Sequence, residues 1–94
     1  MQKYELTVVL DGKATVAKKK KVQEAIEKIV NLSKGKLGKA EDLGTKELAY
    51  KIKKSATGVF LHFPLELDAS EVKSLSVKLN QETEIIRYLL VKNG

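Results

Sequence analysis

The chain of 94 residues contains no cysteine and no tryptophan, only one proline and one histidine, and 5% aromatic residues. Without cysteine it has no disulfide framework, zinc knuckle or thiol chemistry. A single histidine, His62, cannot build a multi-histidine metal site. No apolar run approaches the roughly 18 residues that a membrane span needs. The first residues lack an apolar signal region, so we expect a cytoplasmic protein with no cofactor and no membrane partner.

What the chain does contain is a sizeable apolar fraction and an excess of lysine. Hydrophobic residues make up 43% of the sequence, which is enough for a core, and the length suits one domain over residues 1–94. Lys and Arg total 18 against 12 Asp and Glu, for a net charge of +6, and Arg87 is the only arginine. A small basic domain of this kind favours a polyanionic partner, most often a nucleic acid.

Hydrophobic periodicity predicts six elements in the order strand, helix, strand, strand, helix, strand. The predicted strands cover residues 3–10, 36–52, 59–67 and 84–92, and the helices cover 15–33 and 69–79. Glycines interrupt the second strand and predict a bend or bulge there. This order is the split βαβ, or ferredoxin-like, plan of the α+β class. It predicts a four-stranded antiparallel sheet with both helices on one face.

The ends of the helices carry recognisable signals. Thr15 is a suitable N-cap for the first helix, and Gly35 suits a left-handed position just past its end. Asp68 and Glu71 have the spacing of a capping box at the start of the second helix. The basic stretch 53–58 is expected to form the turn between the second and third strands.

The alternation also predicts what the uncovered sheet face carries: Lys3, Thr7, Val9, Phe60, His62, Arg87 and Leu89. In the last strand we expect Ile86, Tyr88 and Leu90 to face the helices instead, because Arg87 should stay solvated. Phe60, Val9 and Leu89 would then form an exposed apolar patch with cations around it, which is typical of a partner surface. Scattered surface apolar residues are the alternative.

Two clusters of lysine allow two interpretations each. The run from Lys18 to Lys21 is either a phosphate contact or a solvated helix face, with neither favoured. Lys51, Lys53 and Lys54 cluster at the turn, where solubility is slightly favoured over polyanion contact. Since aromatic residues are few, contact with RNA phosphates fits the chain better than base stacking.

One segment carries a specific resemblance. Gly44-Thr45-Lys46-Glu47-Leu48-Ala49-Tyr50-Lys51-Ile52-Lys53 resembles the signature segment of the bacterial small-subunit ribosomal protein S6 family (bS6). Tyr4-Glu5, Gly58, Phe60 and residues 87–92 add to the likeness. Lys51 departs from it, because many members carry proline there.

The resemblance implies a non-catalytic structural protein of the small ribosomal subunit. It would bind the central domain of small-subunit rRNA together with the small-subunit protein S18. Carried over by position, the RNA-binding candidates are Lys3, Lys54, Arg87 and Lys92. The candidates for contact with the protein partner are Tyr50, Phe60 and His62.

Two other functions stay open at this point. The same fold serves acylphosphatase-type enzymes, but these need an arginine in the loop after the first strand, and residues 11–14 contain none. The chain could instead be a stand-alone RNA-binding or small-molecule-sensing regulatory domain that dimerises through a sheet edge. The charged second strand argues against such pairing, so we expect a monomer in isolation.

Overall fold

The computed structural model describes residues 2–52 and 55–92, with side chains described for 2–47 and 57–92. Its elements are β1 (Gln2–Asp11), α1 (Val16–Leu32), β2 (Lys36–Leu37), β3 (Glu41–Ile52), β4 (Ser55–Leu67), the 3₁₀ turn η1 (Ala69–Glu71), α2 (Val72–Asn80) and β5 (Ile85–Lys92). This confirms the predicted order of elements. No helix within the described ranges is long and apolar enough to span a membrane.

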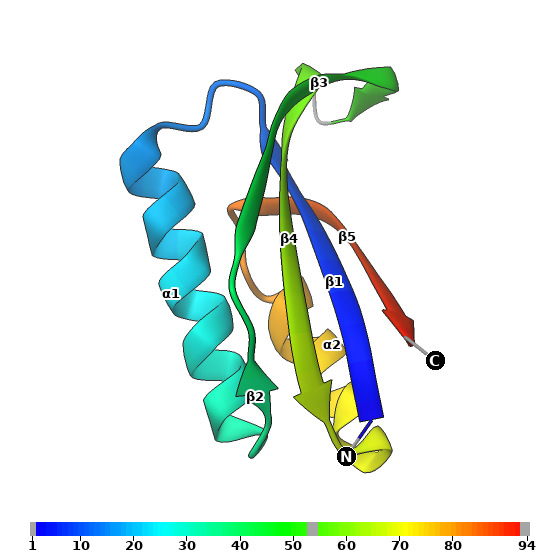
Figure 1. Ribbon diagram of the computed structural model, residues 1–94. Helices are drawn as coiled ribbons and strands as arrows, with labels where there is room; N and C mark the ends of the chain where they lie inside the picture. The colour runs from blue at the N-terminus through cyan, green and yellow to red at the C-terminus, as the bar shows by residue number, and fades with distance from the viewer. Residues whose placement is uncertain (1, 53–54, 93–94) are drawn as a thin grey trace.

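The strands form one antiparallel sheet in the order β2-β4-β1-β5, and β3 also pairs with β4. β2 and β3 are the two parts of the predicted second strand, and they lie along the same edge of β4 (Figure 1). A bulge separates Asp42 from Gly44, whose φ of 86° is a conformation that only glycine adopts easily. The ferredoxin-like plan is therefore confirmed, with its second strand interrupted as the glycines predicted.

Both helices cover the same face of the sheet, and the core lies between the two layers (Figure 1). Alternate residues of β1 and β4 point into this core because side chains on a strand alternate between its faces. The fully buried members with the largest side chains are Phe63, Leu6, Leu10, Ile26, Leu61, Leu67, Leu75 and Leu79. Among the residues that the structure describes, no helix covers the other face of the sheet.

The two ends of α1 are stabilised by different hydrogen bonds. At the start, the Thr15 hydroxyl accepts a hydrogen bond from the backbone N–H of Lys18 at 3.2 Å, which confirms the predicted N-cap. At the end, the left-handed residue is Lys34, with φ 60°, so the prediction for Gly35 is wrong. The N–H groups of Lys34 and Gly35 donate to the carbonyls of Asn31 and Val30, at 3.1 and 2.9 Å. This pair of bonds is a Schellman motif.

Gly35, the residue after Lys34, must be a glycine for a different reason: there is no room for a Cβ at this position. A Cβ on this residue would lie 2.6 Å from the carbonyl oxygen of Glu66 and 3.1 Å from side-chain atoms of Val30 and Leu67. The close approach lets the chain pass directly from α1 into β2 beside β4. Glycine therefore occupies the crowded position, and lysine adopts the left-handed conformation.

The register of β5 corrects the predicted orientation of its first residues. Val9 pairs with Arg87 but Leu10 pairs with Ile85, so the pairing skips Ile86. Ile85 is consequently the core residue, at 7% exposure, and the prediction for Ile86 is wrong. Beyond the bulge, Tyr88 and Leu90 pack against the core as expected.

Two further predictions differ from the structure at element boundaries. Residues 55–58 belong to β4 rather than to a turn, so the hairpin between β3 and β4 extends further than the sequence indicated. The second helix begins with the 3₁₀ turn η1, and the Asp68 side chain makes no capping hydrogen bond to it.

Candidate nucleic-acid interface

The uncovered sheet face, here called the open face, is defined by the strand register, because residues opposite each other in antiparallel strands share a face. Its members are Lys3, Glu5, Thr7 and Val9 of β1, Phe60, His62, Pro64 and Glu66 of β4, and Arg87, Leu89 and Val91 of β5. The predicted assignment to one face agrees with this register for all seven residues: Lys3, Thr7, Val9, Phe60, His62, Arg87 and Leu89.

Positive charge gathers at the two ends of the open face. At one end, Glu66 of β4 is paired with Lys3 of β1 on one side and with Lys36 of β2 on the other, so it lies between the two lysines. At the other end, Arg87 is exposed and lies opposite Val9. Because Lys3 and Val9 are six residues apart on β1, the two ends are separated by about 20 Å.

A second cation joins the Arg87 end of the face. The Nζ atom of Lys46 lies 5.7 Å from the centroid of the Phe60 ring, a distance typical of a cation–π contact. Val9 and Phe60 are opposite each other, so Arg87, Val9 and Phe60 form one row across the sheet. Neither Lys36 nor Lys46 was a sequence-derived candidate, because only the pairing with β4 shows which side of the sheet they join.

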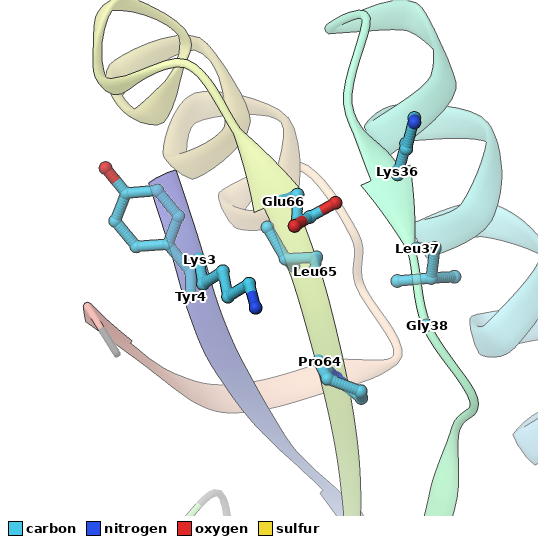
Figure 2. A pocket seen from close by; sticks show the side chains of 8 residues that line it. All are labelled: Lys3, Tyr4, Lys36, Leu37, Gly38, Pro64, Leu65 and Glu66. Atoms are coloured by element: carbon cyan, nitrogen blue, oxygen red, sulfur yellow. The ribbon is translucent and has the colours of Figure 1, made fainter. Parts of the chain in front are cut away.

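A shallow groove of about 320 Å³ lies at the Lys3 end. Figure 2 shows it with Lys3 on β1, Pro64 and Glu66 on β4, and Lys36 and Leu37 on β2. Its apolar floor and the two lysines suit an extended anionic partner better than a small neutral molecule. The carboxylate of Glu66 limits the net positive charge there.

The middle of the open face has a different character. His62 Nε2 lies 3.4 Å from Glu5 Oε1, and His62 Nδ1 lies 3.4 Å from the Thr7 hydroxyl. Glu41 of β3 is paired opposite His62 on its other side. Two carboxylates therefore flank the only histidine, and this part of the face is less favourable for phosphate than the two ends.

The apolar patch is not where the sequence placed it. Val9 is only 6% exposed and Phe60 is half-buried, so the prediction that Val9 forms part of an exposed patch is wrong. Exposed apolar area lies instead on β5, where Leu89 is 63% and Val91 46% exposed. The physical reason is position in the sheet: β1 and β4 are central strands, whereas β5 is an edge strand.

The remaining predicted site residues do not join this face. Lys92 is exposed but pairs with Tyr4, a core residue, so it points to the helix side of the sheet. Lys54 lies outside the described residues. Tyr50 belongs to β3, but its side chain also lies outside the described part of the chain.

Two lysines of the run on α1 form ion pairs with described residues. Lys19 Nζ lies 3.1 Å from Asp42 Oδ2 of β3, and Lys18 Nζ lies 3.9 Å from Glu84 before β5. The backbone N–H of Gly44 and then the ammonium of Lys19 lower the pKa of Asp42 below its ordinary value. Among the described residues, no group of three or more Asp, Glu or His side chains is placed to hold a metal ion.

Comparison of the fold with solved structures defines the class of protein. The chain superposes on the crystal structure of 30S ribosomal protein S6 from Thermotoga maritima with a TM-score of 0.88 and 25% identity. The match covers 98% of this chain and 87% of that one. The chain thus has the fold of that ribosomal protein.

Sequence comparisons identify the family. The protein-family model described as ribosomal protein S6 matches residues 3–92 of this chain. The small ribosomal subunit protein bS6 of Pelagibacter ubique is 32% identical over 92 residues, covering 98% of this chain and 76% of the relative. That of Thermus thermophilus is 28% identical, covering 99% and 92%. The chain therefore belongs to the ribosomal protein S6 family, and it is a structural, non-enzymatic component of the small ribosomal subunit.

Proposed function

We propose that the chain binds the central domain of small-subunit rRNA together with the small-subunit protein S18. The observation that carries this proposal is the division of the open face. Cations stand at its two ends, Lys3 with Lys36 and Arg87 with Lys46, about 20 Å apart along β1. Such a spacing suits contact with separate phosphates of a folded RNA rather than with one small anion.

The middle of the face supports a protein contact instead. Glu5 and Glu41 flank His62, and the neighbouring Phe60 is half-buried and apolar. Carboxylates disfavour phosphate at this place and leave a surface of mixed polarity, which is usual in protein interfaces. We therefore assign Phe60 and His62 to the contact with S18, and Tyr50 is a further candidate for it.

Lys54 and Lys92 complete the RNA-binding candidates. Lys92 ends β5 on the helix side, so it would reach RNA that passes around the edge of the sheet rather than across its open face. Lys54 follows β3 in a stretch rich in lysine.

Binding of a labelled central-domain RNA fragment at rising salt, with and without S18, tests the proposal. When the salt concentration rises fourfold, the affinity falls about threefold for each phosphate contact that the protein makes. Arg87→Gln and Lys3→Gln are each expected to weaken binding and to reduce the salt dependence by about one contact.

The matched control is Lys73→Gln, which removes the same charge from an exposed position on α2, on the other side of the molecule. It is expected to change affinity less than twofold, or about 0.4 kcal/mol. Equal losses in all three variants would show that net charge, and not the open face, drives binding. Binding that does not depend on salt would refute the contact with phosphates.

A further inference from the structure

The groove at the Lys3 end of the open face combines three kinds of chemical group. Glu66 is paired with Lys3 on one side and with Lys36 on the other. Pro64 and Leu37 add apolar surface to the lining of the groove. Figure 2 shows the Lys3 side chain extending from β1 toward β4 and the Glu66 carboxylate extending from β4 toward β2. A hydrogen-bond acceptor therefore lies between two cations, beside an apolar surface.

The floor of this groove is held in place by a hydrogen bond and kept open by a glycine. The backbone N–H of Gly38 donates to the carbonyl oxygen of Pro64 at 2.7 Å, which ties the segment after β2 to β4. A Cβ on Gly38 would lie 2.8 Å from Cγ of Pro64, so any larger residue would place its side chain against the proline ring. Because this position has no side chain, the ring stays partly exposed in the groove.

The carboxylate of Glu66 is available to a ligand. The residue is only partly exposed, and its strand register places a lysine on each side. Among the residues that the structure describes, however, neither Lys3 nor Lys36 forms an ion pair with it. An ionised carboxylate accepts hydrogen bonds and donates none. A group bound between the two lysines must therefore present N–H or O–H donors at this point.

Size and charge together indicate one nucleotide as the occupant. The volume of about 320 Å³ is at the small end of the range for ligand pockets, about 300–1,000 Å³. The backbones of Lys3 and Lys36 are two strand spacings, or about 10 Å, apart across β4. A nucleotide in an RNA strand combines an anionic phosphate on each side, a flat apolar face and neutral N–H donors on the base. These match the two lysines, the proline ring and the carboxylate.

We propose that this groove holds one unpaired guanine nucleotide of the small-subunit rRNA. Its flanking phosphates contact Lys3 and Lys36, and its base lies against the ring of Pro64. The N1–H and N2–H groups of the base donate to the two carboxylate oxygens of Glu66, a paired geometry that adenine, cytosine and uracil do not offer. The inference rests on the proposed function and adds base recognition to the phosphate contacts at this end of the open face.

The sign of the effect of Glu66→Gln on RNA affinity tests this contact. If the groove contacts phosphates alone, removal of a negative charge between two cations strengthens binding of the central-domain RNA fragment. If the carboxylate accepts from a guanine, the same change weakens binding, by about fivefold or more. The control is Glu24→Gln, which removes the same charge from an exposed position on α1 and is expected to leave affinity unchanged or slightly higher. Unchanged or stronger binding by Glu66→Gln would overturn the proposal.

Replacement of single guanosines in the fragment by inosine, which lacks the N2 amine, identifies the nucleotide. At one unpaired position, inosine is expected to weaken binding of the parent protein and to have no effect on binding of Glu66→Gln. If no such replacement weakens binding, or if each acts equally on both proteins, the guanine contact is excluded. A loss of affinity in Glu66→Gln that appears only with S18 present, and without any effect of inosine, would show instead that the groove holds a segment of S18.

The same binding series distinguishes failure of this inference from failure of the proposed function. If Lys3→Gln weakens binding but Glu66→Gln does not, the phosphate contacts stand and the guanine contact fails. If binding does not depend on salt and neither Lys3→Gln nor Arg87→Gln changes the affinity, the proposed function itself fails.

Discussion

Replacing Lys34 by glycine should stabilise the protein, although the change removes a side chain from the end of a helix. Lys34 has φ 60° and occupies the left-handed position of the Schellman motif that ends α1. This conformation costs a residue with a Cβ about 1–2 kcal/mol, because the Cβ approaches the following carbonyl oxygen. Glycine removes that cost, but it also gives the unfolded chain extra conformational freedom. That freedom stabilises the unfolded state and offsets about 0.4–1 kcal/mol of the gain. We expect a net gain of about 0.5–1 kcal/mol in the free energy of unfolding.

The matched control is Lys34→Ala, which removes the same charge and keeps the Cβ. Its free energy of unfolding is expected to stay within about 0.5 kcal/mol of the parent, as for most exposed substitutions. Thermal and urea unfolding followed by circular dichroism measure both variants. For a domain of this size, the glycine variant should melt about 2–8 °C higher than the parent.

The sign of the change decides whether the reasoning holds. If residue 34 were right-handed and Gly35 left-handed, as the sequence pattern indicated, glycine at 34 would destabilise α1 by about 0.5–1 kcal/mol. A lower melting temperature for Lys34→Gly than for Lys34→Ala would therefore refute the assignment of the left-handed position.

Two further predictions concern residues next to the open face. Gly35→Ala places a Cβ 2.6 Å from the Glu66 carbonyl oxygen, so β2 must move away from β4. We expect a loss of about 1–3 kcal/mol in urea unfolding, and an unchanged midpoint would contradict the close approach. Asp42 has a lowered pKa in the folded protein, through the N–H of Gly44 and the ammonium of Lys19. The ionised carboxylate therefore adds stability above the ordinary pKa of aspartate, and that stability is lost as the pH falls through the folded pKa. Asp42→Asn should reduce the loss of stability between neutral and acidic pH, measured by urea midpoints; an identical pH dependence in both proteins would rule the contribution out.

The sequence predicted the faces of most strands but not the consequences of register. Thr7 and His62 were placed on one face by alternation, and the structure brings their side chains within 3.4 Å. Ile86 was assigned to the wrong set, because a bulge adds one residue and reverses the side on which the preceding residues lie. Alternation carries no information about such an insertion.

Only part of the candidate site could be predicted from the sequence, because alternation shows the face of a residue but not which strands pair. Lys3 and Arg87 could be assigned to the open face from period-two patterning, and the structure places them there. Lys36 and Lys46 join the same two ends only because β2 and β3 both pair with β4. Lys92, in contrast, lies on the helix side of the sheet.

Local patterns of residues were enough to predict the order of elements, the N-cap at Thr15, the interruption of the second strand and the positive net charge. These depend on neighbouring residues and on composition. Three other features could be read only from the folded chain: Val9 is buried, Lys34 rather than Gly35 is left-handed, and Leu89 lies on an edge strand. Each of these depends on a contact, or on the lack of one, with a segment far along the chain, and local patterning does not encode such contacts.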